Sequence, residues 1–150
     1  MIPPHQFFMK SHPTNILLVE DNETDVKIIL RAFAKQKYPC HIHTVSDGKE
    51  ALDYLLNHGA FENKTDFPTP DVILLDINMP RMDGHTFVKK IRSFKTLSKI
   101  PIVVFTTKEG MKNAFRIEGV NDYVIKTIDG VKMIEKIREI IKFKQEFFSD

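Results

Sequence analysis

The sequence is poor in the features that mark disulfide-rich, zinc-binding or membrane-spanning proteins. Its 150 residues include a single cysteine, Cys40, which excludes an intrachain disulfide and a cysteine-rich zinc site. No apolar run approaches the roughly 20 residues that a membrane-spanning helix needs. Residues 1–13 lack the apolar stretch and the cleavage site of a secretory signal, so we expect a flexible leader on a cytoplasmic protein.

A strong excess of either charge is also absent. The chain has 22 Lys and Arg against 20 Asp and Glu, and the formal net charge of +2 argues against nucleic acid binding by bulk electrostatics. We therefore expect neither nucleic acid nor a membrane as a partner. The hydrophobic fraction of 42% and the length predict one globular domain with a full core.

Short apolar, β-branched runs alternate with segments of helical periodicity. Strands are expected at residues 15–19, 40–45, 72–75, 100–106 and 122–125. Helices are expected after a cap formed by Asn22 and Asp25, at 48–56, at 84–94 and at 131–148, with room for only a short helix at 110–117. This order predicts a doubly wound α/β fold with a parallel sheet. The polar stretch 58–70 predicts a long surface connection.

Residues able to do chemistry fall where these strands end. Glu20 and Asp21 follow the first strand, Asp76 follows the third, Thr106 closes the fourth and Lys126 follows the fifth. Ligands bind at the carboxyl ends of the strands in such sheets, so we expect these side chains to converge. Crowded carboxylates require a counter-charge, and the oxygen-rich set favours Mg²⁺ over a softer metal.

Together these residue types favour phosphoryl transfer to a carboxylate. Asp76 has the central position that a nucleophile needs, and Mg²⁺ would neutralise one side of the incoming group. Lys126 would contact a second phosphoryl oxygen, and the hydroxyl of Thr106 would donate a hydrogen bond to a third. The predicted product is an aspartyl phosphate at Asp76.

The motifs around these residues resemble those of a known family. The Glu20-Asp21 pair, the run LLDINMPRMDG around Asp76, Thr106 and Lys126 are similar to the receiver domains of response regulators. The resemblance covers residues 14–143, with 144–150 as an extension of the last helix. It implies a flavodoxin-like (βα)5 fold with a five-stranded parallel sheet in the order 2-1-3-4-5.

The resemblance also implies a role for each site residue. Asp21 and Asp76 would bind Mg²⁺ directly, the backbone carbonyl of Asn78 would add a ligand, and Glu20 would act through water. Tyr123, three positions before the lysine, matches the aromatic switch residue of the family. With Thr106 it would repack the face made by the fourth helix, fifth strand and fifth helix on phosphorylation.

The stretch 58–70, the Thr106-Thr107 pair and the long C-terminus more narrowly resemble single-domain regulators related to those paired with cyanobacterial phytochromes. The implied function is a single-domain response regulator that takes phosphate from a sensor histidine kinase and signals through protein contacts. Its output would be such a contact, a relay to a histidine phosphotransfer protein, or feedback on the kinase. It would catalyse its own phosphorylation and dephosphorylation only, so we do not expect an enzyme of metabolism.

Two departures from the family pattern keep an alternative open. Thr127 follows the lysine where the family usually has proline, and the segment 108–120 is short for the family. A pseudo-receiver, an interaction module that never accepts phosphate, therefore remains the alternative. A phosphatase or phosphotransferase with an aspartyl-phosphate intermediate is disfavoured, because Asn78 occupies the position where that class needs a second acid.

Each of these residues has a simpler structural interpretation. Glu20 and Asp21 with Asn22 could cap a helix, Lys126 alone could be a solvated lysine, and Tyr123 could serve packing. His41 and His43 are predicted to be exposed residues of an edge strand, since two histidines without a third ligand do not indicate a metal site. The last helix carries an apolar stripe expected to face the sheet, and further apolar residues widen it beyond one core face: Met133, Ile140, Phe143 and Phe147. Phe147 and Phe148 lie past the usual end of a receiver, which predicts a homodimer seam through the fourth helix, fifth strand and fifth helix and the C-terminal extension.

Overall fold

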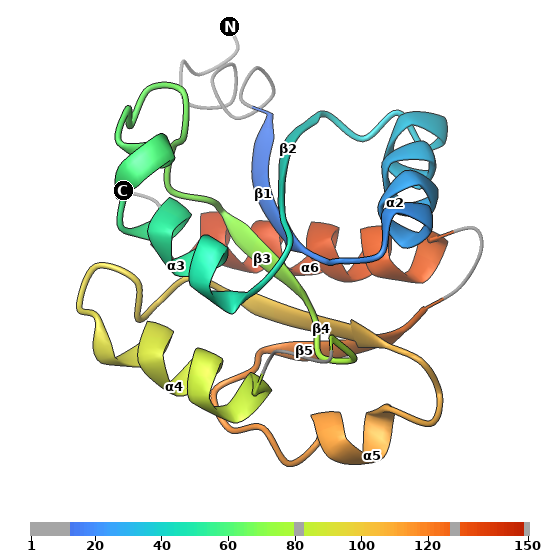
Figure 1. The fold of residues 1–150 in the computed structure, drawn as a ribbon. Helices are drawn as coiled ribbons and strands as arrows, with labels where there is room; N and C mark the ends of the chain where they lie inside the picture. Colours follow the sequence, from blue (N-terminus) through green and yellow to red (C-terminus); the bar gives the residue numbers. More distant parts are fainter. Residues whose placement is uncertain (1–12, 80–82, 127–129, 149–150) are drawn as a thin grey trace, which may run out of the picture.

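The computed structural model describes residues 13–79, 83–126 and 130–148, and in them the predicted doubly wound fold is confirmed. Five parallel strands form one sheet in the order β2-β1-β3-β4-β5 (Figure 1). Their bounds are β1 Thr14–Val19, β2 Cys40–Val45, β3 Val72–Asp76, β4 Ile102–Thr106 and β5 Asp122–Ile125. The order 2-1-3-4-5 implied by the family resemblance is therefore confirmed.

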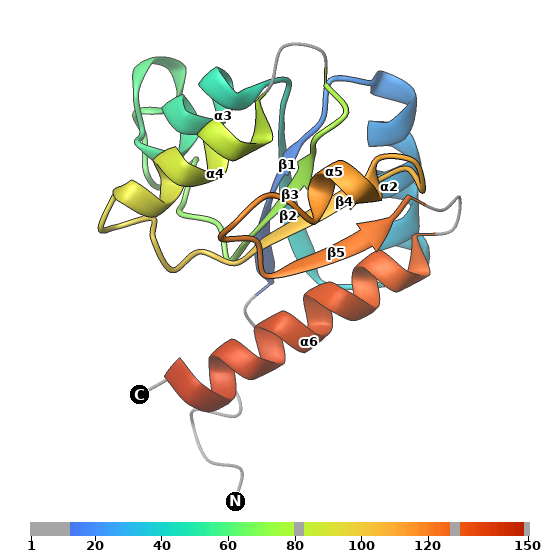
Figure 2. The same ribbon diagram turned by 90° about the horizontal axis from the view of Figure 1, so that it is seen from below.

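Helices cover both faces of this sheet. They are α2 Glu23–Lys35, α3 Gly48–Leu55, α4 Gly84–Ser93, α5 Met111–Ala114 and α6 Val131–Phe148, with a short 3-10 turn at Gly59–Phe61. Helices α2 and α6 lie on one face, and α3, α4 and α5 lie on the other (Figures 1 and 2). No helix in the described part of the chain is long and apolar enough to cross a bilayer.

The central strands β1, β3 and β4 are largely apolar on both faces because each face meets a helical layer. In β1, Leu17 packs into the cluster shared with α3 and α4, whereas its neighbour Leu18 packs into the cluster shared with α2 and α6. All five residues of β3 are buried, and so are all five of β4. A central parallel strand has this pattern, and it explains why the sequence shows continuous apolar runs rather than alternation.

Side-chain caps set the starts of the helices that flank the site. Asn22 caps α2 by accepting a hydrogen bond from the backbone N–H of Asp25 at 2.9 Å, which confirms the predicted capping pair. Asp83 caps α4 in the same way by accepting from the N–H groups of His85 and Thr86. These caps fix where each helix leaves the carboxyl edge of the sheet.

The polar stretch before β3 is more ordered than a simple surface connection. The Asn57 side-chain amide donates to the carbonyls of Phe61 and Phe67, whose rings meet edge to face at 5.1 Å. Tyr54 contacts both rings and also lies 5.4 Å from the His43 ring. His43 is therefore half-buried, and the prediction that it is exposed was wrong because sequence periodicity could not reveal the folded loop beside the edge strand.

The predicted short fourth helix is the single-turn α5, and a half-buried arginine braces the chain that follows it. Arg92 of α4 donates to the carbonyl of Gly119 at 2.8 and 3.0 Å and to the carbonyls of Ser98 and Ile100. It also donates to the side chain of Asn121 at 3.1 Å. One guanidinium thus ties together the connections that lead into β4 and β5.

We expect Arg92→Ala to lower the free energy of unfolding by about 2–3 kcal/mol, because it leaves several carbonyls without their charged donor. Arg92→Lys should recover little, since an ammonium cannot reproduce the planar donor set. Urea denaturation measures both effects, with Lys89→Ala on the exposed side of α4 as the control. Equal midpoints for Arg92→Ala and Lys89→Ala would contradict the bracing role.

Candidate functional site

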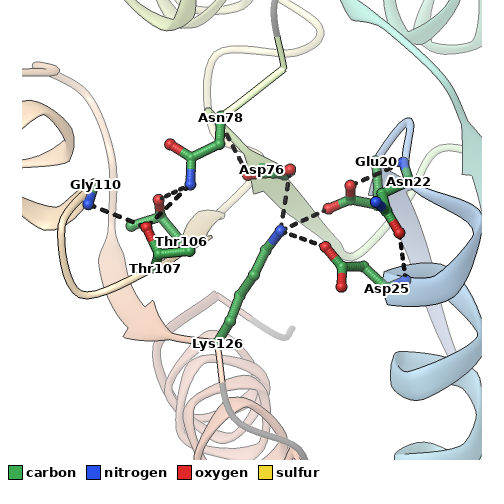
Figure 3. Close-up of polar contacts among 9 residues, drawn as sticks. All are labelled: Glu20, Asn22, Asp25, Asp76, Asn78, Thr106, Thr107, Gly110 and Lys126. Carbon is green, nitrogen blue, oxygen red and sulfur yellow. Dashed lines mark hydrogen bonds and ion pairs between the residues drawn. The ribbon is translucent and has the colours of Figure 1, made fainter.

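The carboxyl ends of the strands bring the predicted residues to one place (Figure 3). Asp76 is the last residue of β3 and Thr106 the last of β4, while Glu20 and Lys126 directly follow β1 and β5. Glu20, Asp76 and Thr106 are buried, so these polar side chains are shielded from solvent at this edge of the sheet. The convergence follows from the parallel pairing, which places all strand ends on the same side.

The ammonium of Lys126 lies at the centre of this group. Its Nζ contacts Asp76 Oδ2 and Glu20 Oε2, each at 3.2 Å, and Asp25 Oδ2 at 2.8 Å. Burial opposes its positive charge, but the hydrogen bond to Asp25 and the charges of Asp76 and Glu20 outweigh burial and raise the pKa of Lys126. Its stem also passes the Phe105 ring, with Nζ 5.2 Å from the ring centroid.

The negative groups are not fully compensated by this one cation. Burial, followed by the hydrogen bond and charge of Asp76, raises the pKa of Glu20 to about 8, although the backbone N–H of Asn22 and the charge of Lys126 act in the opposite direction. Asn22 N donates to Glu20 Oε1 at 3.0 Å. The raised pKa means that burial and the neighbouring Asp76 disfavour a second charged carboxylate at this place.

Three acids have the chemistry of a magnesium site. Ligand oxygens of Glu20, Asp21 and Asp76 all lie within 4.8 Å of one another. Oxygen is the donor that Mg²⁺ prefers, and a dication would supply the counter-charge that the raised pKa of Glu20 calls for. The residues present therefore fit Mg²⁺. Asn78 lies beside this cluster, with its backbone N–H donating to Asp76 Oδ1 at 2.9 Å; the ligand role of its carbonyl stays a prediction.

The hydroxyl of Thr106 is held by Asn78 in this structure. The side-chain amide of Asn78 donates to Thr106 Oγ1 at 2.8 Å and lies 3.4 Å from Thr107 Oγ1. The loop after β4 closes directly over this bond: a Cβ added at Gly110 would lie 2.2 Å from Thr106 Oγ1. The tight packing makes any displacement of Thr106 dependent on this loop.

The predicted switch residue Tyr123 lies away from the acids. Its ring is half-buried and meets the exposed Phe115 ring edge to face at 4.9 Å. Its hydroxyl donates to the carbonyl of Ile117 at 3.3 Å. Tyr123 therefore bridges β5 and the chain after α5, and its switching role stays a prediction. Thr127, the departure from the family pattern, lies outside the described residues.

Asp25 is a site residue that sequence reasoning missed. From the sequence, Asp25 was predicted only to pair with Asn22 in the helix cap, and its backbone N–H does donate to the Asn22 side chain. Its carboxylate, however, makes the shortest contact of the Lys126 ammonium. The available signal was its place in the first turn of α2, close in sequence to the Glu20-Asp21 pair.

Comparison with known proteins agrees with this fold and site. The response regulator receiver domain family matches residues 16–138, most of the chain. The chain belongs to the response regulator receiver family. Receiver domains take their phosphoryl group from sensor histidine kinases and bind Mg²⁺ at an acidic site of this kind. Tyr54 and Arg92, by contrast, donate hydrogen bonds to loop carbonyls that lie outside this acidic site.

Individual relatives show how far the likeness extends. The probable methanogenesis regulatory protein FilR2 of Methanothrix harundinacea is 36% identical over 133 residues, covering 85% of this chain and 83% of FilR2. The crystal structure of the phosphorylated cyanobacterial phytochrome response regulator RcpA is 32% identical, covering 92% of this chain and 96% of RcpA with a TM-score of 0.65.

Two further relatives show how much of each protein the similarity covers. The Mn²⁺-bound form of response regulator Rcp1 is 28% identical, covering 92% of this chain and 96% of that one, with a TM-score of 0.63. The chain also matches the longer response regulator PleD of Caulobacter vibrioides at 32% identity over 86% of its own length, but it spans only 26% of PleD. The likeness to PleD is therefore to one domain of a larger protein.

The raised pKa of Glu20 predicts a pH-dependent stability of the metal-free protein. A carboxyl whose folded pKa of about 8 exceeds its ordinary value of 4.5 contributes stability that is present below 4.5 and is lost as the pH rises to 8. Glu20→Gln should remove that loss and raise the free energy of unfolding at pH 8 by on the order of 1–2 kcal/mol. Unfolding of both proteins in chelator from pH 5 to 9 measures this, and parallel curves would refute it.

Proposed function

We propose that this chain accepts a phosphoryl group on Asp76 from a sensor histidine kinase, with Mg²⁺, and signals through phosphorylation-dependent protein contacts. The observation that carries the proposal is the Asp76 carboxylate, buried at the end of β3 with the Lys126 ammonium 3.2 Å from one oxygen. Glu20 and Asp21, which together with Asp76 fit Mg²⁺, lie beside it. A carboxylate nucleophile between two positive charges is what phosphoryl transfer requires.

The transfer is a substitution at phosphorus with no change of oxidation state. An oxygen of Asp76 forms the new P–O bond as the P–N bond to the kinase imidazole breaks, and the leaving nitrogen keeps the electron pair and takes a proton. Lys126 exchanges its contact with Asp76 Oδ2 for a non-bridging phosphoryl oxygen. Asp21 and Asp76 would hold Mg²⁺, with Glu20 acting through water, and the ion would supply positive charge to the transferred group.

The switch proposed for Thr106 uses the same geometry. Its Oγ1 accepts from the Asn78 amide, so its own hydrogen is available to donate to a phosphoryl oxygen. A move of Thr106 toward Asp76 would release the Asn78 amide and shift the closely packed Gly110 loop. Tyr123, with its ring against Phe115, would then repack the surface of α5, β5 and α6. The signal thus passes from one hydroxyl to a partner-binding face.

Several expectations from the sequence belong to this proposal. The chain would catalyse only its own phosphorylation and dephosphorylation, and its partners would be a histidine kinase and a further protein such as a histidine phosphotransfer protein. The cytoplasmic location stays a prediction. A pseudo-receiver that never accepts phosphate is the alternative, and the buried Asp76 with its lysine and neighbouring acids argues against it.

We expect a gain of one phosphoryl group when the protein is incubated with acetyl phosphate and Mg²⁺, measured by intact mass. The gain should vanish in Asp76→Asn, which removes the nucleophilic oxygen, and in chelator. Circular dichroism of Asp76→Asn checks that the variant is folded. An unmodified mass for folded wild-type protein, with acetyl phosphate and with an active histidine kinase as donors, would favour the pseudo-receiver.

We further propose homodimerisation through the face made by α5, β5 and α6. Phe115, Ile125 and Phe143 of this face are exposed by 65%, 42% and 55%, which is unusual for large apolar side chains. The side chains of Phe147 and Phe148, also predicted for the seam, lie outside the described ones. Met133 is buried in the core, so the prediction that it widens the apolar stripe beyond the core face was wrong.

Phe143→Ser should weaken the dimer about tenfold or more, because it removes a large apolar side chain that is 55% exposed on this face. Sedimentation velocity over a wide concentration range, with and without acetyl phosphate, measures the association. Leu30→Ser on α2, with its side chain 40% exposed, is the matched control on another face. A monomer at every concentration in both phosphorylation states would contradict the proposed homodimer.

A further inference from the structure

The carboxylate of Asp25 points at the Lys126 ammonium (Figure 3) and makes its shortest contact. The distance from Nζ to Asp25 Oδ2 is 2.8 Å, against 3.2 Å to Glu20 and to Asp76. An ammonium has three hydrogens, so these three carboxylates occupy its full donor capacity. Asp25 comes from α2 rather than from a strand end, and it therefore approaches the lysine from a different element.

We infer that Asp25 is a positioning residue that holds the Lys126 ammonium in place for phosphoryl transfer to Asp76. The inference rests on the proposed function, since it concerns the lysine that would contact the transferred group. Asp25 does not touch the reacting atoms in this arrangement. It acts through Lys126 by fixing where the ammonium waits before the phosphoryl group arrives.

The other two contacts of Lys126 cannot serve as permanent anchors. Asp76 is the nucleophile, so its oxygen must exchange the lysine for phosphorus during the transfer. Glu20 belongs with Asp76 to the acidic cluster that fits Mg²⁺, and a carboxylate shared with a dication attracts an ammonium less. Asp25 lies outside that cluster, so its attraction for Lys126 persists when the cluster is neutralised.

The surroundings of the lysine make an anchor necessary. Its flexible stem borders a pocket of about 170 Å³ whose lining is mostly apolar and includes Ile28, Ile29, Phe105, Val124 and Met133. A side chain with four rotatable bonds beside open space has other rotamers available. Asp25, at the rim of the same pocket, selects the rotamer that points toward Asp76.

Asp25 is itself fixed by the start of α2. Its backbone N–H donates to the Asn22 side chain at 2.9 Å, and the Asn22 N–H donates to Glu20 Oε1 at 3.0 Å. Glu20 in turn contacts Lys126, which closes a ring of polar contacts from Glu20 through Asn22 and Asp25 to the lysine. The position of the ammonium is thus tied to the backbone of the helix cap.

A simpler role for Asp25 is to stabilise the helix as an acid of its first turn. Glu23 lies in the same turn, is exposed, and is not among the carboxylates that contact Lys126. Glu23→Gln and Asp25→Asn therefore remove the same charge from the same turn, and they differ in the contact with the lysine. Glu23→Gln is the matched control.

The rate constant of phosphorylation by acetyl phosphate with Mg²⁺ tests the inference. We expect Asp25→Asn to lower it roughly tenfold, as loss of one charged hydrogen bond predicts, and Glu23→Gln to change it by less than about twofold. Asp25→Glu should restore most of the rate, because a longer carboxylate can still reach Nζ. In a Lys126→Ala background, Asp25→Asn should not lower the rate constant further, because the lysine that Asp25 positions is absent.

A spectroscopic readout separates positioning from a general effect on the fold. The NH₃⁺ group of Lys126, held by three acceptors, should give a slowly exchanging ¹H–¹⁵N signal that is absent in Lys126→Ala. The signal should persist in Glu23→Gln and disappear or shift in Asp25→Asn. A signal and a rate for Asp25→Asn equal to those of Glu23→Gln, or additive effects with Lys126→Ala, would overturn the inference.

The proposed function has its own outcome in this experiment. If wild-type protein and Glu23→Gln both remain unphosphorylated with acetyl phosphate and with an active histidine kinase as donors, the proposed function fails and the positioning role falls with it. If both are phosphorylated and Asp25→Asn reacts at the same rate, only the positioning role of Asp25 is refuted. Thermal unfolding of each variant confirms that the rates compare folded proteins.

Discussion

The interaction on which the site depends is the attraction between the Lys126 ammonium and the carboxylates that surround it. Parallel pairing places the ends of β1, β3 and β5 on one edge, and with them Glu20, Asp76 and the lysine. Two buried carboxylates side by side would repel strongly in a medium of low dielectric constant. Lys126 offsets part of that repulsion, and the raised pKa of Glu20 shows that part of it remains. A site in this condition is prepared to take up further positive charge.

The same edge of the sheet links the Asp76 site to the surface through short segments of chain. Thr106 ends β4, and the loop that follows packs so closely on its hydroxyl that Gly110 has no room for a side chain. That loop leads into the single turn of α5, whose neighbour Phe115 covers the Tyr123 ring. On the far side, Arg92 fixes the chain between α5 and β5. The segment between these two restraints is the part of the fold most able to transmit a small shift of Thr106.

The sequence was sufficient for the fold and for the residues at strand ends, and insufficient for contacts between elements. Buried strands leave continuous apolar runs, so the order of elements could be predicted, and the topology then placed Asp76 beside Lys126. Asp25 could not be assigned, because capping already explained an acid after Asn22 and only the structure shows its carboxylate reaching the loop after β5. His43 was misjudged for a related reason: its partners Tyr54 and Phe67 come from a loop that has no periodic pattern.

The energetics of the site argue for a chemical role over a purely structural one. Burying Glu20 and Asp76 carries a desolvation penalty, and Lys126 compensates it only in part. Apolar residues of similar size at these strand ends would bind the two helical layers together with less cost to stability, as they do elsewhere in β3 and β4. A module that only displayed a surface for partners would gain nothing from this buried cluster of charges. The exposed surface of α5, β5 and α6 lies outside the cluster. The arrangement is useful when Asp76 gains charge and oxygen atoms from a phosphoryl group, because the excess negative charge is then shared by a dication and the ammonium already in place.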